Sequence, residues 1–448
     1  MAIDLAKLNH VSPARLAAFE ILRRVEDGDF SSVLLAAKEE DLKAADRGLC
    51  HELVLGVLRW QLQLDKIIEY FANRKVNSLD LGVRLALRLG LYQLRFLTRV
   101  PASAAVNESV NLVGHARLRS AQGLVNAVLR RATREPDYDP AAGISDPIEE
   151  IAIQTSHPVW LIERWARSFG VEETRSFASA NNQTPLIAFR IVHSRANESD
   201  LLTKLRSAGA IVEPSPLAPG AWRVSGAQSS LRHLASVGDV YLQDEASQLV
   251  AGVLEPRAGQ QVLDLCAAPG GKTTQIADLV RDRALIVAAD LSARRLSTVA
   301  KTSMVQQLTS IKCMVLDATR PLPFPAGVFD RVLVDAPCSG TGTLRHNPEI
   351  RWRISAEDIQ SLSARQKQLL LNAASVVKPG GRLIYSTCSV ELDENEEVVS
   401  SFLGRDDRFR QVRVPVASGL LTQSGSARTW PQRQGSDGFF IAAFERKK

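Results

Sequence analysis

Apolar residues recur at the spacing of one helix face through the first third of the chain, beginning with Leu16, Phe19, Leu22 and Val25. Ser12 and Pro13 precede this run as an N-cap and a first helical residue. The same periodicity predicts further helices at 32–38, 44–59, 62–71, 79–97, 102–114 and 120–134. Because strand-like alternation is almost absent, we expect residues 1–138 to form an all-α domain.

The pattern then changes twice. Residues 135–150 contain three prolines and a run of acids, which predicts a linker. Residues 150–240 mix both periodicities and predict a small α+β module without chemistry of its own. Its expected elements are helices at 158–169 and 200–208, a strand at 186–192 and an extended piece at Arg223 and Val224.

The last part of the chain, residues 241–448, has short apolar runs separated by helical segments. The runs do not alternate with polar residues, so both faces of each strand are expected to be covered, as in a parallel doubly wound Rossmann-like α/β sheet. The predicted parallel strands are 261–265, 284–289, 312–316, 331–334 and 381–385, with helices at 273–280, 292–308 and 358–377. Two later runs, 410–416 and 439–444, predict antiparallel edge strands.

Charge and cysteine content narrow the class of protein. The net charge of +6 is compatible with a nucleic-acid partner but does not establish one. The N-terminus has no apolar signal region, and no run of about 18 apolar residues predicts a membrane span. Five cysteines without a CxxC pair indicate free thiols in a reducing cytoplasm and no metal site. Cys50 and Cys313 lie in apolar contexts and are expected to be buried.

Two groups of arginines are candidates for RNA contact. Arg345, Arg351 and Arg353 accompany Trp352 in LRHNPEIRWR, which suits phosphate contact and base stacking as well as it suits a packed tryptophan among solvated charges. The other group flanks the helix at 120–134 and forms either a solvated helix face or an RNA-facing surface. It consists of Arg117, Arg119, Arg130, Arg131 and Arg134.

The carboxyl ends of the parallel strands carry a set of reactive side chains. Ligands of such sheets bind at this edge. The loop CAAPGGK opens a helix whose N-terminus favours an anionic group, and Asp290 follows at the distance where an acid takes ribose hydroxyls. A P-loop would need glycine at Cys266, and a GxGxxG motif is absent. S-adenosylmethionine fits better, with its carboxylate at the loop, its ribose at Asp290 and its adenine near Asp317. The expected cofactor-binding residues are Cys266, Ala267, Ala268, Pro269, Gly270, Gly271, Lys272, Asp290, Asp317 and Asp335.

Two cysteines at the same edge, Cys338 and Cys388, indicate the reaction. A cysteine beside a methyl donor suits an acceptor carbon that is not nucleophilic by itself, such as carbon 5 of a pyrimidine. A thiolate that adds at carbon 6 activates carbon 5, and Asp335 is positioned to stabilise the adduct at ring N3. Residue chemistry leaves open which of the two cysteines attacks.

Three motifs together closely resemble the Sun-type RNA cytosine-5 methyltransferases: CAAPGGK (266–272), DAPCSGTG (335–342) and YSTCS (385–389). The segments RGLCHELVLGVLRW and VNAVLRR resemble the NusB-like RNA-binding domain. The resemblance implies that Cys388 is the nucleophile, that Cys338 helps to resolve the adduct and that Asp335 contacts the base. It also implies that Lys272 lies near the reacting centre, that Asp290 and Asp317 contact the cofactor and that the substrate is small-subunit (16S) ribosomal RNA.

Two other functions remain possible from the sequence. A non-catalytic RNA-binding or assembly factor could retain the fold, although the intact Asp335, Cys338 and Cys388 argue against it. An enzyme that methylates an amino group would carry an Asn/Asp-Pro-Pro-aromatic loop where this chain has DAPC. We expect RNA as the partner, neither DNA nor a membrane, and a monomer.

Overall fold

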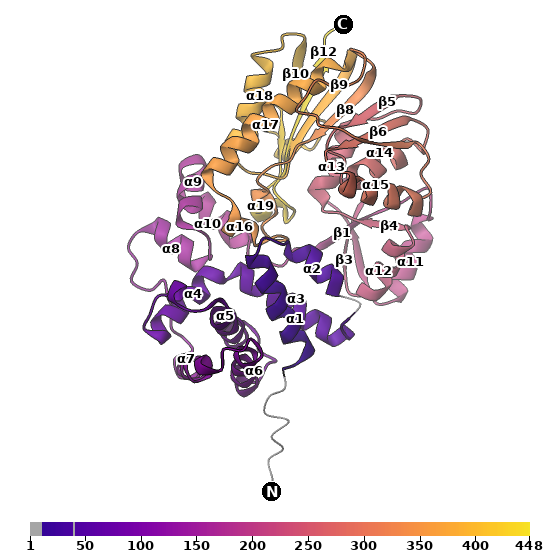
Figure 1. Ribbon diagram of the computed structural model, residues 1–448. Helices are drawn as coiled ribbons and strands as arrows, with labels where there is room; N and C mark the ends of the chain where they lie inside the picture. Colours follow the sequence, from indigo (N-terminus) through magenta and orange to yellow (C-terminus); the bar gives the residue numbers. More distant parts are fainter. Residues whose placement is uncertain (1–10, 39–40) are drawn as a thin grey trace. The chain divides into compact units, whose positions relative to one another are not determined.

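The computed structural model describes residues 11–38 and 41–448, so the first ten residues of the expected 1–138 domain lie outside it. The chain forms two compact units (Figure 1). The first consists of Met1–Gln183 and Leu344–Arg353, and the second of Thr184–Thr343 and Ile354–Lys448.

The first unit begins with the all-α arrangement that the periodicity predicts. Amphipathic helices bury their apolar faces in one core that includes Leu53, Ile67, Leu87 and Leu129. The helices are α1 (Pro13–Glu26), α2 (Ser31–Lys38), α3 (Ala44–Arg59), α4 (Gln61–Ala72), α5 (Leu81–Phe96), α6 (Ala102–His115) and α7 (Gln122–Arg134), with short 3₁₀ turns η2 (Val76–Ser78) and η3 (Arg119–Ala121).

The linker predicted at 135–150 is wrong at its end, because helix α8 (Pro147–Gln154) begins inside it. The side chain of Asp146 accepts a hydrogen bond from the Ile148 backbone N–H, and Pro147 occupies the first helical position. Both are helix-start signals. Helices α9 (Val159–Phe169) and α10 (Val171–Ala180) complete the first unit before residue 184.

A four-stranded antiparallel sheet opens the second unit. Its order is β2 (Ile211–Pro214), β3 (Ala221–Ser225), β1 (Ile187–Ile191) and β4 (Val240–Leu242), with helices α11 (Glu198–Ser207) and α12 (Gln228–Ser236). Apolar residues of both layers, including Phe189, Leu205 and Leu231, form its core. The α+β character predicted for this part of the chain is therefore confirmed, but residues 150–183 of the predicted 150–240 module belong to the first unit.

The large sheet contains the predicted parallel strands. They lie in the order β9 (Val377–Thr387), β8 (Phe329–Asp335), β5 (Gln261–Asp264), β6 (Leu285–Asp290) and β7 (Ile311–Val315), and all neighbours are parallel. Antiparallel strands β12 (Phe440–Arg446) and β10 (Phe409–Val412) extend it beyond β9, and β11 (Ala427–Arg428) pairs with β12. Only β10 of the two predicted edge strands lies at the edge of this path, because β12 is paired on both sides.

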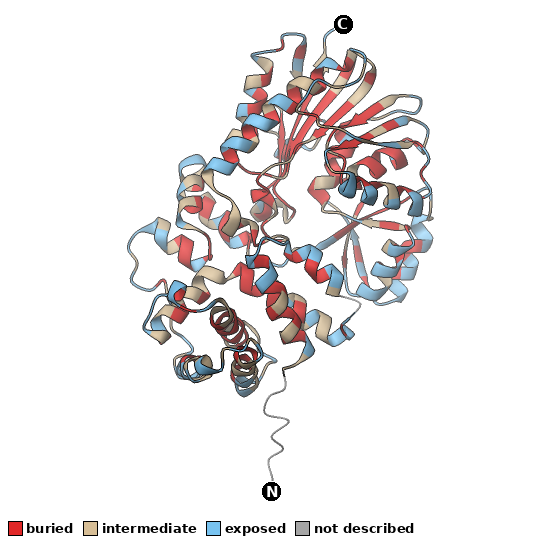
Figure 2. Ribbon diagram, viewed as in Figure 1, coloured by how far each residue is buried: buried red, intermediate tan, exposed pale blue. Residues whose placement is uncertain are grey.

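Helices cover both faces of this sheet. On one face, α13 (Glu245–Val253) and α14 (Gly271–Leu279) pack on Val262, Ile286 and Leu333. On the other face, α17 (Ala356–Ser375) and α18 (Glu396–Leu403) pack on Leu263 and neighbouring strand residues. Figure 2 shows the strands as almost continuously buried, which explains their uninterrupted apolar runs. The remaining elements are α15 (Ala293–Val305), α16 (Ile350–Arg353), α19 (Pro431–Gln434), η4 (Thr341–Thr343), η5 (Leu392–Glu394) and η6 (Ser418–Leu420).

The segment Leu344–Arg353 belongs to the first unit although its flanking sequence belongs to the second. Arg351 is fully buried and donates hydrogen bonds to the Ser156 carbonyl oxygen (3.1 Å) and to Asn182 Oδ1 (2.9 Å). The Trp352 indole N–H donates to the Leu58 carbonyl oxygen at 2.8 Å.

This packing corrects one interpretation of the sequence. Arg351 is fully buried and Arg345 is only 3% exposed, so neither can present its guanidinium group to an RNA phosphate. Trp352 packs within the first unit instead of offering its ring to a base. Among the described residues, no helix combines the length and the apolar character needed to cross a membrane.

Candidate active site

The site lies where the strand order of the large sheet reverses. The chain proceeds from β5 outward to β6 and β7, and then returns to β8 and β9 on the other side of β5. The carboxyl ends of β5 and β8 therefore diverge into loops on either side of a crevice, as in other doubly wound sheets. The loop 266–270 follows β5, Asp335 ends β8, and Cys388 follows β9.

The CAAPGGK loop is shaped by small residues. Gly270 has φ of +109°, and a Cβ atom at that position would lie 3.1 Å from the Val299 Cα. Only glycine adopts this backbone conformation readily, and a side chain would also press on α15. Ala267 and Ala268 are buried, and α14 begins at Gly271. The loop thus brings its backbone and a helix N-terminus to the crevice.

Asp290 lies at the end of β6 and is buried beside this loop. Its carboxylate accepts hydrogen bonds from the backbone N–H groups of Ser292 (3.0 Å) and Ala268 (3.4 Å). Arg295 closes the arrangement by donating to the Ala268 carbonyl oxygen at 2.9 Å. These residues line a cavity of about 370 Å³, a size typical of small-molecule sites. Its lining also includes Cys266, Asp335, Cys338 and Cys388.

Asp317 does not line this cavity, although its neighbours Leu316 and Ala318 do. Its Oδ1 accepts hydrogen bonds from the Thr319 hydroxyl (2.6 Å) and the Thr319 backbone N–H (3.0 Å). Those bonds to Thr319 lower the pKa of the carboxyl group. The side chain therefore acts as a turn aspartate, and its predicted contact with a cofactor stays a prediction.

Lys272 and Asp335 form a partly buried ion pair across the crevice. Lys272 Nζ lies 2.7 Å from Asp335 Oδ2, and the Ser386 hydroxyl donates to Asp335 Oδ1 at 2.7 Å. Burial alone would lower the pKa of Lys272, but the Asp335 carboxylate outweighs it and the pKa is raised. The lysine is therefore protonated and holds the acid in one orientation.

The two cysteines of the DAPC and STCS motifs meet at this ion pair. Cys338 Sγ and Cys388 Sγ are 3.3 Å apart, although the residues are 50 positions apart in sequence. The hydrogen bond with Cys388, followed by burial, raises the pKa of Cys338 well above the usual thiol value. Burial also raises the pKa of Cys266, which makes it a poor nucleophile. The structure thus brings together two thiols, an acid and a lysine, as the strand ends predicted.

A second cavity of about 180 Å³ adjoins the first on the other side of the loop. Cys266, Ala268 and Asp335 line both cavities, so Asp335 lies between the larger and the smaller one, and Lys272 lines the smaller one. Tyr241, Gln243 and Asp264 complete the smaller one.

Several of these residues were not identified from the sequence. Asp264 was detectable, since it directly precedes the loop at the end of β5, and Ser386 lies inside the motif YSTCS. Arg295 and Arg365 come from helices α15 and α17, and no local motif marks them. Cys313 was expected to be buried and is exposed, because β7 is an edge strand of the sheet.

Asp264 makes the stability of the protein depend on pH. Burial raises its pKa from 3.8 to about 7, while the Thr273 hydroxyl donates to its Oδ2 at 2.7 Å. Between these two pH values the folded state binds a proton that the unfolded state has released, so stability falls as pH rises and is constant above about pH 7. We expect Asp264→Asn to be more stable than the unchanged protein at pH 8, on the order of 2 kcal/mol, and the gain to vanish near pH 4. Thermal unfolding of both proteins from pH 4 to 8 measures this, and parallel curves would contradict it.

Comparison with known proteins agrees with this geometry. Residues 251–445 match the family described as 16S rRNA methyltransferase RsmB/F, residues 12–134 match the NusB family, and residues 157–230 match the ferredoxin-like domain of RsmF/B-like methyltransferases. Over 444 residues the chain is 34% identical to the probable ribosomal RNA small subunit methyltransferase B of Bacillus subtilis strain 168, covering 96% of this chain and 98% of that one. The chain belongs to the RsmB/F family.

Other proteins resemble it over a similar length. The Synechocystis sp. protein, also named probable ribosomal RNA small subunit methyltransferase B, is 36% identical over 97% of this chain and 99% of its own. The crystal structure of PH0851 has a TM-score of 0.83 and 30% identity over 98% of this chain and 99% of that one. The expected NusB-like domain, small α+β module and Rossmann-like methyltransferase domain are therefore confirmed, and the module matches a ferredoxin-like domain.

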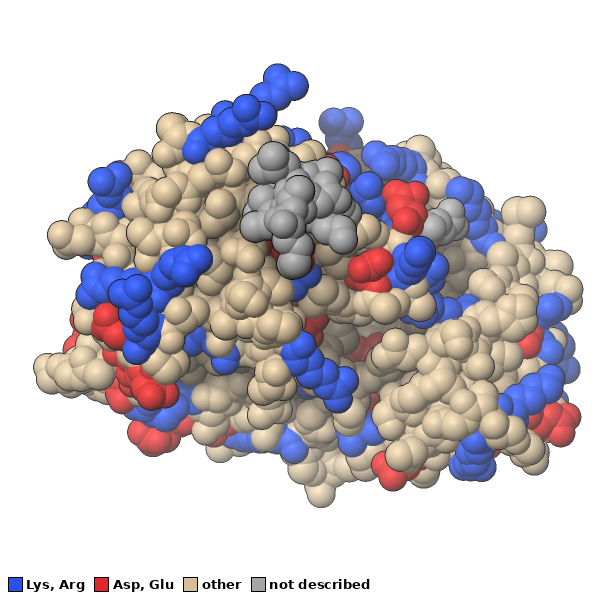
Figure 3. Space-filling view, turned by 90° about the horizontal axis from the view of Figure 1, so that it is seen from below, with Lys and Arg blue, Asp and Glu red and all other residues tan. Residues whose placement is uncertain are grey.

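The arginines around α7 of this RsmB/F protein are exposed, as either of their two interpretations requires. Arg131 is engaged locally, with Nε 3.2 Å from Glu135 Oε1 and its guanidinium over the Tyr70 ring. Figure 3 shows basic side chains in several separate groups, with acidic ones between them, on the face in view. An RNA-binding role for the α7 arginines stays a prediction.

Proposed function

We propose that this RsmB/F protein is an S-adenosylmethionine-dependent methyltransferase that modifies carbon 5 of a cytosine in small-subunit ribosomal RNA through a covalent cysteine adduct. The observation that carries the proposal is the pair of thiols 3.3 Å apart beside the Lys272–Asp335 ion pair. Methyl transfer to an amino nitrogen needs no thiol, whereas carbon 5 of a pyrimidine must first be activated by addition at carbon 6.

The residues of the larger cavity suit the cofactor. The backbone of 266–271 and the N-terminus of α14 would hold the carboxylate of S-adenosylmethionine, and the Asp290 carboxylate would accept hydrogen bonds from the ribose hydroxyls. Leu291 and Leu316 supply apolar lining for a purine. When bound, the cofactor supplies an electrophilic methyl group. Every other part of the reaction depends on residues of this chain.

The proposed mechanism uses the thiols and the acid in sequence. The Cys388 thiolate forms a bond with carbon 6, and the electron pair of the 5,6 double bond becomes available at carbon 5. Carbon 5 would form the new bond to the methyl group as the methyl–sulfur bond of the sulfonium breaks and its electron pair stays on that sulfur. As the thiolate adds, ring N3 takes up a proton, and Asp335, held by Lys272 and Ser386, accepts a hydrogen bond from that N3–H and stabilises the adduct. A base then takes the carbon-5 proton, the electrons of that bond restore the double bond, and the carbon 6–sulfur bond breaks so that the Cys388 sulfur leaves as a thiolate. Cys338 lies next to Cys388 and is the residue proposed to assist that last step.

The roles of the two cysteines rest on the family resemblance, and the site is compatible with them. Cys338 has a raised pKa and is therefore held as the neutral thiol beside its neighbour. A neutral thiol is a weak nucleophile but can exchange a proton with the departing sulfur.

Small-subunit ribosomal RNA is proposed as the substrate because the related proteins are named for it. The NusB-family part, residues 12–134, is the proposed RNA-binding region. We further propose that the protein acts as a monomer in the cytoplasm and does not use DNA.

Methylation of unmodified RNA in vitro tests the proposal. Purified protein, S-adenosylmethionine carrying a tritiated methyl group and transcribed 16S ribosomal RNA should yield labelled 5-methylcytidine after digestion to nucleosides. Bisulfite sequencing of the product then locates the target. Label in an N-methylated cytidine would favour an amino-methylating enzyme. Cofactor binding without label in any RNA would favour an assembly factor that has kept the fold.

A further inference from the structure

Glu394 is a buried acid that the mechanism above does not use. It ends the short turn η5 after β9 and has no exposed surface. Its Oε2 accepts hydrogen bonds from the hydroxyls of Ser339 and Ser389, both at 2.5 Å. Its Oε1 accepts from the Ser339 backbone N–H and from Gln366 Nε2, both at 2.9 Å.

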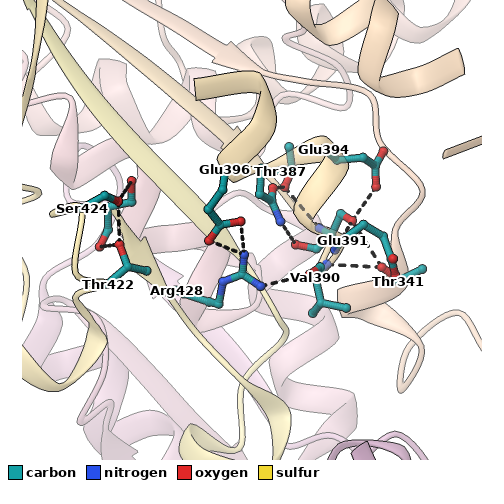
Figure 4. Close-up of polar contacts among 12 residues, drawn as sticks. Thr341, Thr387, Val390, Glu391, Glu394, Glu396, Thr422, Ser424 and Arg428 are labelled. Atoms are coloured by element: carbon teal, nitrogen blue, oxygen red, sulfur yellow. Dashed lines mark hydrogen bonds and ion pairs between the residues drawn. The ribbon is translucent and has the colours of Figure 1, made fainter. Parts of the chain in front are cut away.

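The two serines are the residues that directly follow the two cysteines. Ser339 comes after Cys338 in the loop of β8, and Ser389 comes after Cys388 in the loop of β9. One carboxylate oxygen therefore joins both loops at the position next to each sulfur. Figure 4 shows Glu394 directed toward the region of Val390 and Thr341, where the two loops meet.

Backbone contacts support the same junction. The Gly342 N–H donates to the Cys388 carbonyl oxygen at 3.0 Å, and the Val390 N–H donates to Thr341 Oγ1 at 3.2 Å. A Cβ atom at Gly342 would lie 2.0 Å from the Gly438 carbonyl oxygen, so only glycine allows this approach. The neighbouring Asn395 donates to the Ser389 carbonyl oxygen at 2.9 Å.

A carboxylate is a costly choice for this position. The four donors that it accepts from are neutral, and burial raises its pKa. Burying a charge without a cationic partner is unfavourable, and its hydrogen bonds offset the cost only in part. An apolar residue would cost less if the position served packing alone.

We propose that Glu394 is a positioning residue that holds the Cys338 and Cys388 loops together, so that the two sulfurs act on one nucleotide. That the two sulfurs act on one nucleotide rests on the proposed function. That Glu394 holds the two loops together does not depend on it. Without this acceptor, the two serine side chains would be joined only by the contact of their own hydroxyls (3.0 Å) and by the longer contacts of both with Thr341 Oγ1, so the separation of the sulfurs would be held less firmly. The carboxylate also contributes, after the Cys388 hydrogen bond and burial, to the raised pKa of Cys338.

Formation of a disulfide between Cys338 and Cys388 measures the separation of the sulfurs without RNA or cofactor. Diamide oxidises two thiols to a disulfide and is itself reduced to the hydrazine, and mass spectrometry identifies the linked peptides. We expect Glu394→Ala to slow this step by on the order of tenfold or more, and Glu394→Gln to slow it less, because an amide keeps one acceptor oxygen. An unchanged or faster rate in a folded Glu394→Ala protein overturns the proposal.

The serines provide a second test, which does not use the Glu394→Ala protein. Because the two hydroxyls also contact each other at 3.0 Å, some non-additivity between Ser339→Ala and Ser389→Ala is expected in any background. If the carboxylate couples the loops, the non-additive part of their effect on the disulfide rate is larger in the unchanged protein than in Glu394→Gln. Equal non-additivity in both backgrounds, or additivity in both, overturns the proposal. This cycle remains informative if Glu394→Ala fails to fold.

Glu245→Gln is the matched control. Glu245 is also buried, and it accepts hydrogen bonds from the Ser215 hydroxyl and from Arg223 Nε (2.9 Å), but it contacts neither cysteine loop. The disulfide should form in the Glu245→Gln protein at the same rate as in the unchanged protein. If Glu245→Gln slows it as much as Glu394→Gln does, the effect comes from a general loss of packing and not from the cysteine loops. In the methylation assay, Glu394→Gln should lower kcat and leave the KM for S-adenosylmethionine unchanged. If the RNA carries no label at carbon 5, the proposed function fails while the disulfide result still decides the role of Glu394.

Discussion

Cys388→Ala is expected to abolish methyl transfer and the covalent RNA–protein complex, whereas Cys338→Ala should form the complex and accumulate it. Removal of an attacking thiol leaves carbon 5 without activation, and losses of at least about a thousandfold are typical when a nucleophile is deleted. Removal of the second thiol affects only the release step, so protein bound to RNA builds up. Denaturing gels of reactions with labelled RNA, together with tritium incorporation, measure both effects.

Cys313→Ala is the control for this pair, because Cys313 is an exposed thiol on β7 outside the lining of both cavities. It should leave methylation and complex formation unchanged. The reverse pattern, with complex accumulating in Cys388→Ala, would exchange the two roles. The 3.3 Å separation of the sulfurs is compatible with either order.

Arg351→Ala is expected to destabilise the first unit by about 4 kcal/mol. The substitution empties a fully buried volume and leaves the Ser156 carbonyl oxygen and Asn182 Oδ1 without their donor. Urea unfolding measures the loss, and hydrogen exchange of residues 344–353 locates it. We expect faster exchange in that segment before any change in the strands of the large sheet.

Arg130→Ala is the control that shows whether the loss of any arginine would destabilise the first unit. Arg130 is exposed on α7 and donates only to Asn126 Oδ1 among its described hydrogen bonds. Its effect should stay within about 0.5 kcal/mol. If Arg351→Ala unfolds at the same urea concentration as the unchanged protein, the buried contacts of Arg351 do not hold the segment.

The fold could be predicted where the hydrophobic pattern is long. The helix predicted at 44–59 coincides with α3, and the parallel strands follow from apolar runs covered on both faces. Short elements were missed, since β2 and β4 have only four and three residues and show no usable period. Helix α8 was missed for a different reason, because prolines and acids outweighed the Asp146–Pro147 start signal.

Some residues of the site could likewise be predicted from the sequence, and others could not. Cys338, Cys388, Asp335 and Lys272 could be placed together because the carboxyl ends of parallel strands share one edge. Arg351 could not be placed, because its acceptor Ser156 is 195 residues away and the local sequence is that of a solvated basic segment. Glu394 gave no signal either: Ser389 lies only 5 positions earlier, but the partner that makes it join two loops, Ser339, lies 55 positions earlier.

The segment Leu344–Arg353 has a consequence for the order in which the protein can be completed during synthesis. Helices α1 to α10 emerge first, but the unit that they form also contains a segment roughly 170 residues further along the chain. The backbone N–H of Ser31, for example, donates a hydrogen bond to Glu349, which lies 318 residues later and is synthesised long after it. At typical translation rates the helices would lack the segment Leu344–Arg353 for roughly 10–30 s. The surface that later receives Arg351 and Trp352 is open during that interval, so a nascent chain halted before residue 353 should be a better chaperone substrate than the finished protein.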